Sequence, residues 1–238
     1  MKRALLSALA LLAAAPVLAH DLWLEPDPAG VRAVYGHAGE GGGADRYRLF
    51  EVKAQAAAGK GAVSLLDAAK PGYDTMPPLA LPPAAGGARV VAARYDGGFW
   101  VKTAMGSRNT NRLNVPDALE SRWSLKFAKL VLPGAQALSG AVGHRLEIVP
   151  LADPYRLKAG EPLKVRVDLD GKPLPGAALT IGAPNSEQAA KMEADEAGTA
   201  EIAARPGLTL LNVSRKVPGS APQLAAEDDL SATLVFGR

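Results

Sequence analysis

Three histidines are the side chains of this sequence best placed to do chemistry: His20, His37 and His144. His20 follows Val17-Leu18-Ala19, a small-residue sequence typical of a signal-peptide cleavage site. Cleavage after Ala19 would make His20 the first residue of the mature protein. Its free α-amine and its ring Nδ1 could then close a chelate ring on a transition metal, and imidazole suits nickel, copper, zinc or iron.

The other two histidines also lie where a side chain can be presented. His37 lies in a glycine-rich loop at the end of a predicted strand, and His144 immediately precedes another strand. Glu40 shares the loop of His37, and its carboxylate could ligate a metal or hydrogen-bond a ligating ring. We therefore predict a metal site built from His20, His37, His144 and Glu40. The spacing alone leaves open whether these residues converge.

The first nineteen residues have the pattern of a secretory signal. Lys2 and Arg3 are basic, residues 4–17 are apolar, and a cleavage site ends at Ala19. The apolar stretch is too short to span a bilayer, and no later stretch is long and apolar enough. We expect residues 1–19 to be a signal peptide, the mature chain to be periplasmic, and no membrane span to remain after cleavage.

Composition narrows the chemistry further. The chain has no cysteine, which excludes disulfides, thiolate metal sites and cysteine nucleophiles. Metal ligands must therefore be histidine, carboxylate, methionine or backbone groups. Lys2 and Arg3 would leave with the signal, so 25 of the 27 basic side chains would remain against 24 acidic ones. This near-neutral balance, without a basic run, argues against nucleic acid as a partner.

Motifs of common enzymes are missing from the sequence. There is no Gly-x-Ser-x-Gly elbow, and the glycines at 41–43 are not followed by Gly-Lys-Ser/Thr. Residues 168–171 (DLDG) lack the downstream glutamate of a calcium loop and are typical of a hairpin turn. We expect a binding protein and not an enzyme.

Alternating apolar and polar residues predict a mainly β fold. The first strand, around Leu22-Trp23-Leu24, would anchor the new N-terminus so that a chelate there does not fray. Residues 55–87 are rich in Ala, Gly and Pro and predict a meander with turns such as Lys70-Pro71-Gly72. Further strands are predicted at 31–35, 47–54, 88–95, 99–103, 145–151, 163–169, 177–181, 199–203, 208–213 and 230–236.

Two segments of the first half carry specific expectations. Asp96-Gly97-Gly98 predicts a hairpin turn between strands 88–95 and 99–103. Residues 118–132 place Leu119, Trp123, Phe127 and Leu130 on one helical face, so one short helix is expected there. A strand is the alternative interpretation for residues 126–132, which also alternate.

Ala152-Asp153-Pro154 is typical of a domain boundary. We expect an N-terminal β-rich domain over residues 20–150, which carries the candidate metal site. A C-terminal β-sandwich of immunoglobulin-like or transthyretin-like type is expected over residues 151–238.

Five ordered motifs give the chain a family resemblance: residues 20–26 (HDLWLEP), 35–40 (YGHAGE), 100–103 (WVKT), 143–154 (GHRLEIVPLADP) and 170–177 (DGKPLPGA). The sequence resembles a bacterial periplasmic family of unknown function whose members are often described as components of cobalt or nickel uptake (ABC-type transport) systems. The resemblance implies two immunoglobulin-like β-sandwich halves and periplasmic residence. It also implies a metal role for the motifs that carry His20, His37 and His144.

The leading hypothesis is a periplasmic protein that binds nickel or cobalt, with a membrane metal permease as its partner. Copper is the chemical rival because it outcompetes nickel at nitrogen sites. Affinity should fall as imidazoles and amines protonate, near and below neutral pH. An alternative is a copper-binding histidine-brace protein or oxidase, and another is a structural or adhesive β-sandwich without a metal.

Overall fold

The computed structural model describes residues 20–55, 61–66, 77–81, 87–134, 140–158, 160–203 and 206–237. The predicted signal peptide (1–19) and the predicted turn at 70–72 lie outside the described residues. The expectation of a mainly β fold is confirmed. The described residues contain no α-helix, and the 3-10 turn η3 (Arg112–Asn114) follows the β6–β7 hairpin.

The strands form three sheets. A three-stranded sheet holds β1 (Asp21–Asp27), β2 (Gly30–Gly36) and β3 (Gly42–Gly43). A four-stranded sheet holds β9 (Leu146–Pro150), β10 (Pro162–Leu169), β11 (Lys172–Pro173) and β14 (Thr199–Ala203). The central nine-stranded sheet holds β4 (Leu49–Gln55), β5 (Ala62–Ser64), β6 (Val90–Thr103), β7 (Gly106–Arg108), β8 (Glu120–Val131), β12 (Ala178–Gly182), β13 (Ala190–Glu193), β15 (Leu208–Pro218) and β16 (Glu227–Gly237).

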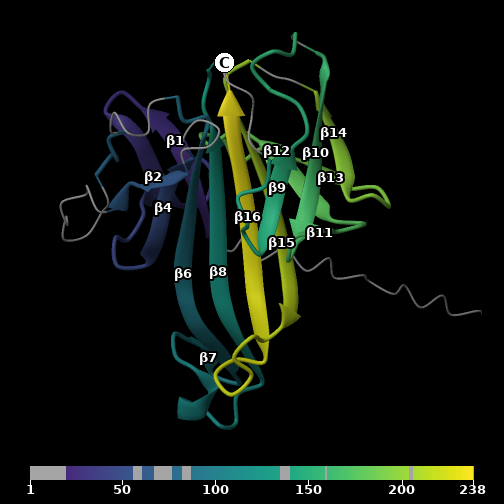
Figure 1. The fold of residues 1–238 in the computed structure, drawn as a ribbon. Helices are drawn as coiled ribbons and strands as arrows, with labels where there is room; N and C mark the ends of the chain where they lie inside the picture. Colours follow the sequence, from purple (N-terminus) through teal and green to yellow (C-terminus); the bar gives the residue numbers. More distant parts are fainter. Residues whose placement is uncertain are drawn as a thin grey trace, which may run out of the picture.

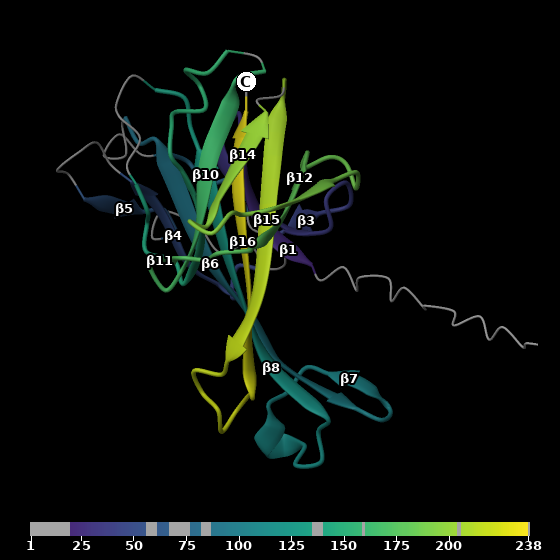
Figure 2. The same cartoon turned by 90° about the vertical axis from the view of Figure 1, so that its right-hand side faces the viewer.

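The two smaller sheets cover opposite faces of the central sheet. Figure 1 shows β1 and β2 to one side of the long strands β6, β8 and β16, with β10 and β14 to the other side. Viewed at right angles, β7, η3 and the adjoining end of β8 project beyond the layers (Figure 2). Strands β8 and β16 therefore lie in the middle layer, and residues 124–131 carry buried side chains on both faces.

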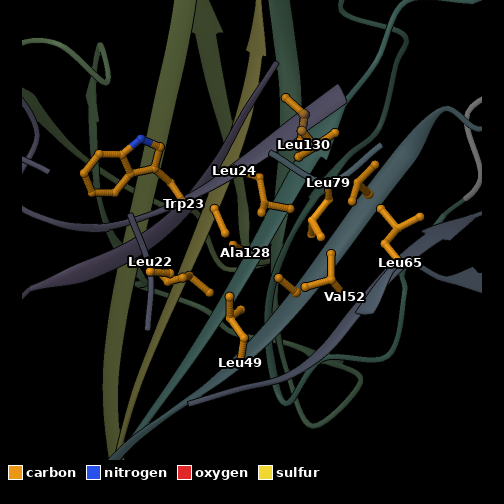
Figure 3. Close-up of a cluster of buried hydrophobic side chains, with 14 of the residues drawn as sticks. Leu22, Trp23, Leu24, Leu49, Val52, Leu65, Leu79, Ala128 and Leu130 are labelled. Atoms are coloured by element: carbon orange, nitrogen blue, oxygen red, sulfur yellow. The ribbon is translucent and has the colours of Figure 1, made fainter. Parts of the chain in front are cut away.

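Each face of the central sheet has its own apolar core. One core joins the β1–β2 hairpin to Ala128 and Leu130 of β8, and Figure 3 shows Leu22 and Leu24 among its side chains. The other joins β9 and β10 to Leu125 and Phe127, which point the opposite way from β8. Leu22 and Leu24 are fully buried, and each such side chain contributes about 1.5–3 kcal/mol to folding. This burial holds β1, and therefore the residue that precedes it, against the central sheet.

The helix predicted within residues 118–132 is wrong, because this segment is the strand β8. The apolar side chains are compatible with both periods, but sheets on both sides select the extended form. Lys126, Ala128 and Leu130 face one side, while Phe127 and Lys129 face the other. The strand interpretation of residues 126–132 is confirmed.

The hairpin turn predicted at Asp96-Gly97-Gly98 is also wrong. Strand β6 continues through these residues and pairs with β8 on both sides of them. The register shifts between Asp96 and Gly98, where Gly98 has φ +80°. This is a β-bulge, in which the Asp96 carboxylate accepts the Gly98 N–H at 2.8 Å. Asp-Gly-Gly therefore kinks a strand here and does not reverse it.

Strands of both predicted domain ranges share the central sheet. Strand β16 pairs in parallel with β8, and β9 of the first range pairs with β10 of the second. The division at residues 20–150 and 151–238 stays a prediction, as does the immunoglobulin-like topology. No helix of the described residues is long and apolar enough to cross a membrane.

Candidate metal centre

The β1–β2 hairpin places His20 directly opposite His37. The paired residues run from Asp27↔Gly30 to Asp21↔Gly36, and the next position along the ladder would place His20 opposite His37. The turn between the strands is fixed by Asp27, whose carboxylate accepts the Ala29 N–H at 2.9 Å and the Arg32 guanidinium at 2.6 Å. The hairpin register therefore brings the two imidazoles to neighbouring cross-strand positions.

The two rings have the spacing of metal ligands. Their centroids lie 4.6 Å apart, with an angle of 72° between the planes. A ring nitrogen about 2.0–2.1 Å from a metal puts its ring centroid about 3.2 Å from that metal, so neighbouring ligand rings have centroids about 4.5–5.2 Å apart. His20 is exposed and His37 is half-buried, so an ion can reach them from solvent.

Contacts to the central sheet hold this end of the hairpin. The Thr233 hydroxyl of β16 donates to the Leu22 carbonyl at 2.7 Å. The loop after His37 passes tightly over Trp23: a Cβ at Gly41 would lie 2.2 Å from the indole. At Gly36, φ is +149° and a Cβ would lie 2.8 Å from the Gly41 Cα. Both glycines are therefore required by the loop that carries His37.

Two stacked tyrosines, Tyr35 and Tyr95, lie next to the His20 ring. The Tyr35 ring lies edge-on to His20 at 5.3 Å and stacks on Tyr95 of β6 at 4.8 Å. Burial raises the pKa of both phenols, so both are neutral at physiological pH. The sequence pattern did not predict that Tyr35 and Tyr95 would stack. Tyr35 is placed by the hairpin register, in which it pairs with Leu22.

Two charged side chains lie close to the histidines: Asp21, which is half-buried, and Lys126, which is buried. Burial raises the pKa of Asp21, against the opposing charge of Lys126. Burial also lowers the pKa of Lys126, while Asp21 raises it. The Lys126 ammonium lies 3.4 Å from the Ser231 hydroxyl. Lys126 interrupts the apolar run of β8, which is the sequence signal that could have identified it.

The structure does not bring His144 to the pair. His144 is buried against Phe127, with ring centroids 5.2 Å apart, on the face of β8 opposite to Lys126. Burial, together with the charges of Lys129 and Arg94, lowers the pKa of His144 to about 3. Its ring is therefore neutral at physiological pH, and its Nε2 has no hydrogen-bond partner among the described residues.

Glu40 lies near the pair in sequence but is exposed to solvent. Its backbone N–H donates to the His37 carbonyl at 3.0 Å, which closes the turn after β2. Among the described residues, no group of three or more His, Cys, Asp or Glu side chains is placed to hold a metal ion. The structure therefore brings together His20 and His37 of the predicted set, and not His144 or Glu40.

A sequence model of the family described as "Domain of unknown function (DUF4198)" matches residues 17–217. The chain belongs to the DUF4198 family. The DUF4198 match contains the whole β1–β2 hairpin, both of its histidines and most of the central sheet. Comparison with curated proteins and with solved structures gave no match. The DUF4198 description assigns no activity, so the function is argued from the geometry of the hairpin.

Proposed function

We propose that the mature protein binds a divalent transition metal through three nitrogens: the α-amine and ring of His20 and the ring of His37. The observation that carries this proposal is the cross-strand pair of imidazoles with centroids 4.6 Å apart. Signal cleavage after Ala19 supplies the amine. The same cleavage places the protein in the periplasm.

The third nitrogen is needed because two imidazoles alone hold a metal weakly. Among the described residues no third histidine or carboxylate joins the pair. An α-amine on His20 fills this role, because it forms a chelate ring with the imidazole of the same residue. The fully buried Leu22 and the hydrogen bond from Thr233 to its carbonyl keep that terminus in place. The ligand set is then ordered before the metal arrives.

Nickel or cobalt is the proposed cargo, as the resemblance to uptake components suggests, and a membrane metal permease is the proposed partner. A nitrogen-rich set of this kind also binds copper, which lies above nickel in the stability order of divalent metals. The test below therefore compares the affinities for nickel, cobalt and copper.

Isothermal titration of the mature protein with nickel, cobalt and copper tests the proposal. We expect one ion per chain. One alanine added before His20, or His37→Ala, should weaken binding at least tenfold. Glu40→Gln is the matched control in the same loop and should bind like the parent. Parent-like affinity for all three metals in both the extended form and His37→Ala would overturn the proposal.

Copper redox chemistry is the second candidate, and the tyrosine next to His20 is the observation that favours it. A phenol ring edge-on to the candidate ligand at 5.3 Å could shield one side of a bound copper ion. The copper-loaded protein should then produce peroxide from oxygen when ascorbate is supplied. Peroxide no higher than with the one-alanine-extended protein would rule this activity out. A purely structural sandwich, in contrast, shows no thermal shift with any metal.

A further inference from the structure

We propose that the groove beside His20 binds the carboxylate of a small organic chelator, so that the protein takes its metal as a chelate and not as a bare ion. This inference rests on the proposed function, because the metal is the link between the chelator and the histidines. The groove is formed by β2, β6, β8 and β16 and is distinct from the cavity beside His37.

The groove has room for a small organic acid. Its volume is about 210 Å³, and its charged or ring-bearing lining residues are His20, Tyr35, Trp100, Arg122, Lys126 and Asp229. For comparison, an engineered apolar cavity of about 150 Å³ holds benzene. The groove therefore holds a candidate metal ligand together with two cationic side chains and one carboxylate. A bound chelator could reach both the candidate ligand and the cationic side chains.

The charge in the groove selects an anion. Lys126 is 4% exposed, and among the described residues its ammonium forms no ion pair within 4.0 Å; the charges of Asp21 and Asp229 act on it from farther away. A buried ammonium without a close counter-ion is costly, and an arriving carboxylate would relieve that cost. Arg122 contacts Asp229 through its Nε at 3.4 Å, and its side chain is 36% exposed. The Arg122 side chain lines the groove, and a guanidinium matches a carboxylate in shape.

The neighbouring cavity has the opposite character. It has a volume of about 150 Å³ and is lined by His37, Trp23 and Leu210, with the acidic residues Asp21 and Glu187. No lysine or arginine of the described residues lines this cavity. The two spaces adjoin the two imidazoles of the pair, and the groove beside His20 is the one that offers cationic side chains to an organic acid.

The coordination number supplies the reason for a chelator. Three protein nitrogens leave at least one position open on a square-planar or tetragonal nickel or copper ion. The described residues offer no further His, Asp or Glu for it. A chelator with two carboxylates could fill that position with one and place the other against Lys126 and Arg122.

Nickel-dependent retention of a labelled chelator tests this inference. The mature protein is dialysed with radiolabelled citrate, malate or L-histidine, with and without nickel, and nickel binding alone is titrated in parallel. We expect at least one of the three to be retained at about one per chain only when nickel is present. Lys126→Met and Arg122→Gln should each reduce retention at least tenfold, while nickel alone still binds within about twofold of the parent.

Lys102→Met is the matched control, because this lysine is exposed and pairs with Glu120 outside the groove. Arg122→Gln keeps the test decisive if Lys126→Met fails to fold. Nickel binding without retention of any of the three chelators would overturn the inference and leave the proposed function standing. Equal displacement of the chelator by inorganic phosphate would show a general anion site and would also overturn it. Absence of nickel binding under every condition would overturn both.

Discussion

Two lysines of β8 lie three residues apart on opposite faces of the central sheet, and their surroundings differ. Lys129 is buried and forms a 2.7 Å ion pair with Glu147, whose carboxylate also accepts backbone N–H groups of residues 142–144. Lys126 is equally buried, but its closest polar contact is the Ser231 hydroxyl at 3.4 Å. One lysine belongs to a completed network, and the other faces a groove.

The histidines follow the same division. His144 lies in the core beside Lys129, neutral and closed off from solvent, while His20 and His37 lie at the surface beside Lys126. A completed buried network stabilises the fold, whereas an incomplete one next to an accessible ligand pair is where a bound group is expected. We therefore propose that the face that carries β1 is the functional face of this protein and that the face that carries β9 is structural.

The largest expected effect comes from breaking the completed network. Lys129→Met should destabilise the fold by about 3–5 kcal/mol, because it leaves the Glu147 carboxylate buried without its cation. Lys126→Met should cost less than about 2 kcal/mol, because its ammonium has only the 3.4 Å contact with the Ser231 hydroxyl and no carboxylate within ion-pair distance among the described residues. Chemical denaturation of both variants measures the difference, and equal losses would remove the distinction between the two faces.

A smaller effect is expected from crowding the loop that carries His37. Gly41→Ala should destabilise by about 1–3 kcal/mol, because its Cβ would lie 2.2 Å from the Trp23 indole. It should also weaken nickel binding, because the loop must shift. Gly42→Ala is the matched control, since a Cβ there meets nothing within 4 Å. Thermal melts and nickel titrations of the pair check this, and a Gly42→Ala variant that behaved like Gly41→Ala would contradict it.

The smallest expected effect is a contribution of His144 to the pH dependence of stability, which distinguishes it from His20 and His37. Burial holds the pKa of His144 at about 3, below its unfolded value of about 6.5. The folded state then binds fewer protons, so this contribution to stability is complete above pH 6.5 and is lost as pH falls towards 3. The slope is about 1.4 kcal/mol per pH unit.

His144→Leu should remove that slope. Between pH 6.5 and 5.5, the parent should lose about 1 kcal/mol more of its free energy of unfolding than the variant does. Denaturant titrations at the two pH values measure this. Nickel affinity at pH 7.5 should be unchanged in His144→Leu, and a loss of affinity there would place His144 back in the metal site.

Much of the fold follows from local pattern. Alternation predicted strands such as residues 163–169 and 230–236, which are β10 and the core of β16. The helix prediction at 118–132 failed because a strand covered on both faces has no polar side to reveal its period. The hairpin prediction at Asp96-Gly97-Gly98 failed because Asp and Gly are favoured both in turns between strands and in bulges within a strand. In both places a tertiary contact with a distant segment decided the structure.

The candidate site was partly within reach of the sequence. The turn at Asp27–Gly30 fixes the hairpin register, and counting back from it pairs His20 with His37. The position of His144 could not be obtained in this way, because it depends on which face of β8 is covered by the strands after residue 145. Lysines 126 and 129 within an apolar run were the visible sign of buried polar chemistry on both faces.

The most direct measurement of the central claim is the count of nitrogen ligands in the copper-loaded protein. Electron paramagnetic resonance of the mature form should show three equatorial nitrogens, and the form with one alanine before His20 should lose the chelating amine and change its spectrum. Identical spectra for the two forms, or one nitrogen in the mature form, would contradict the proposed ligand set.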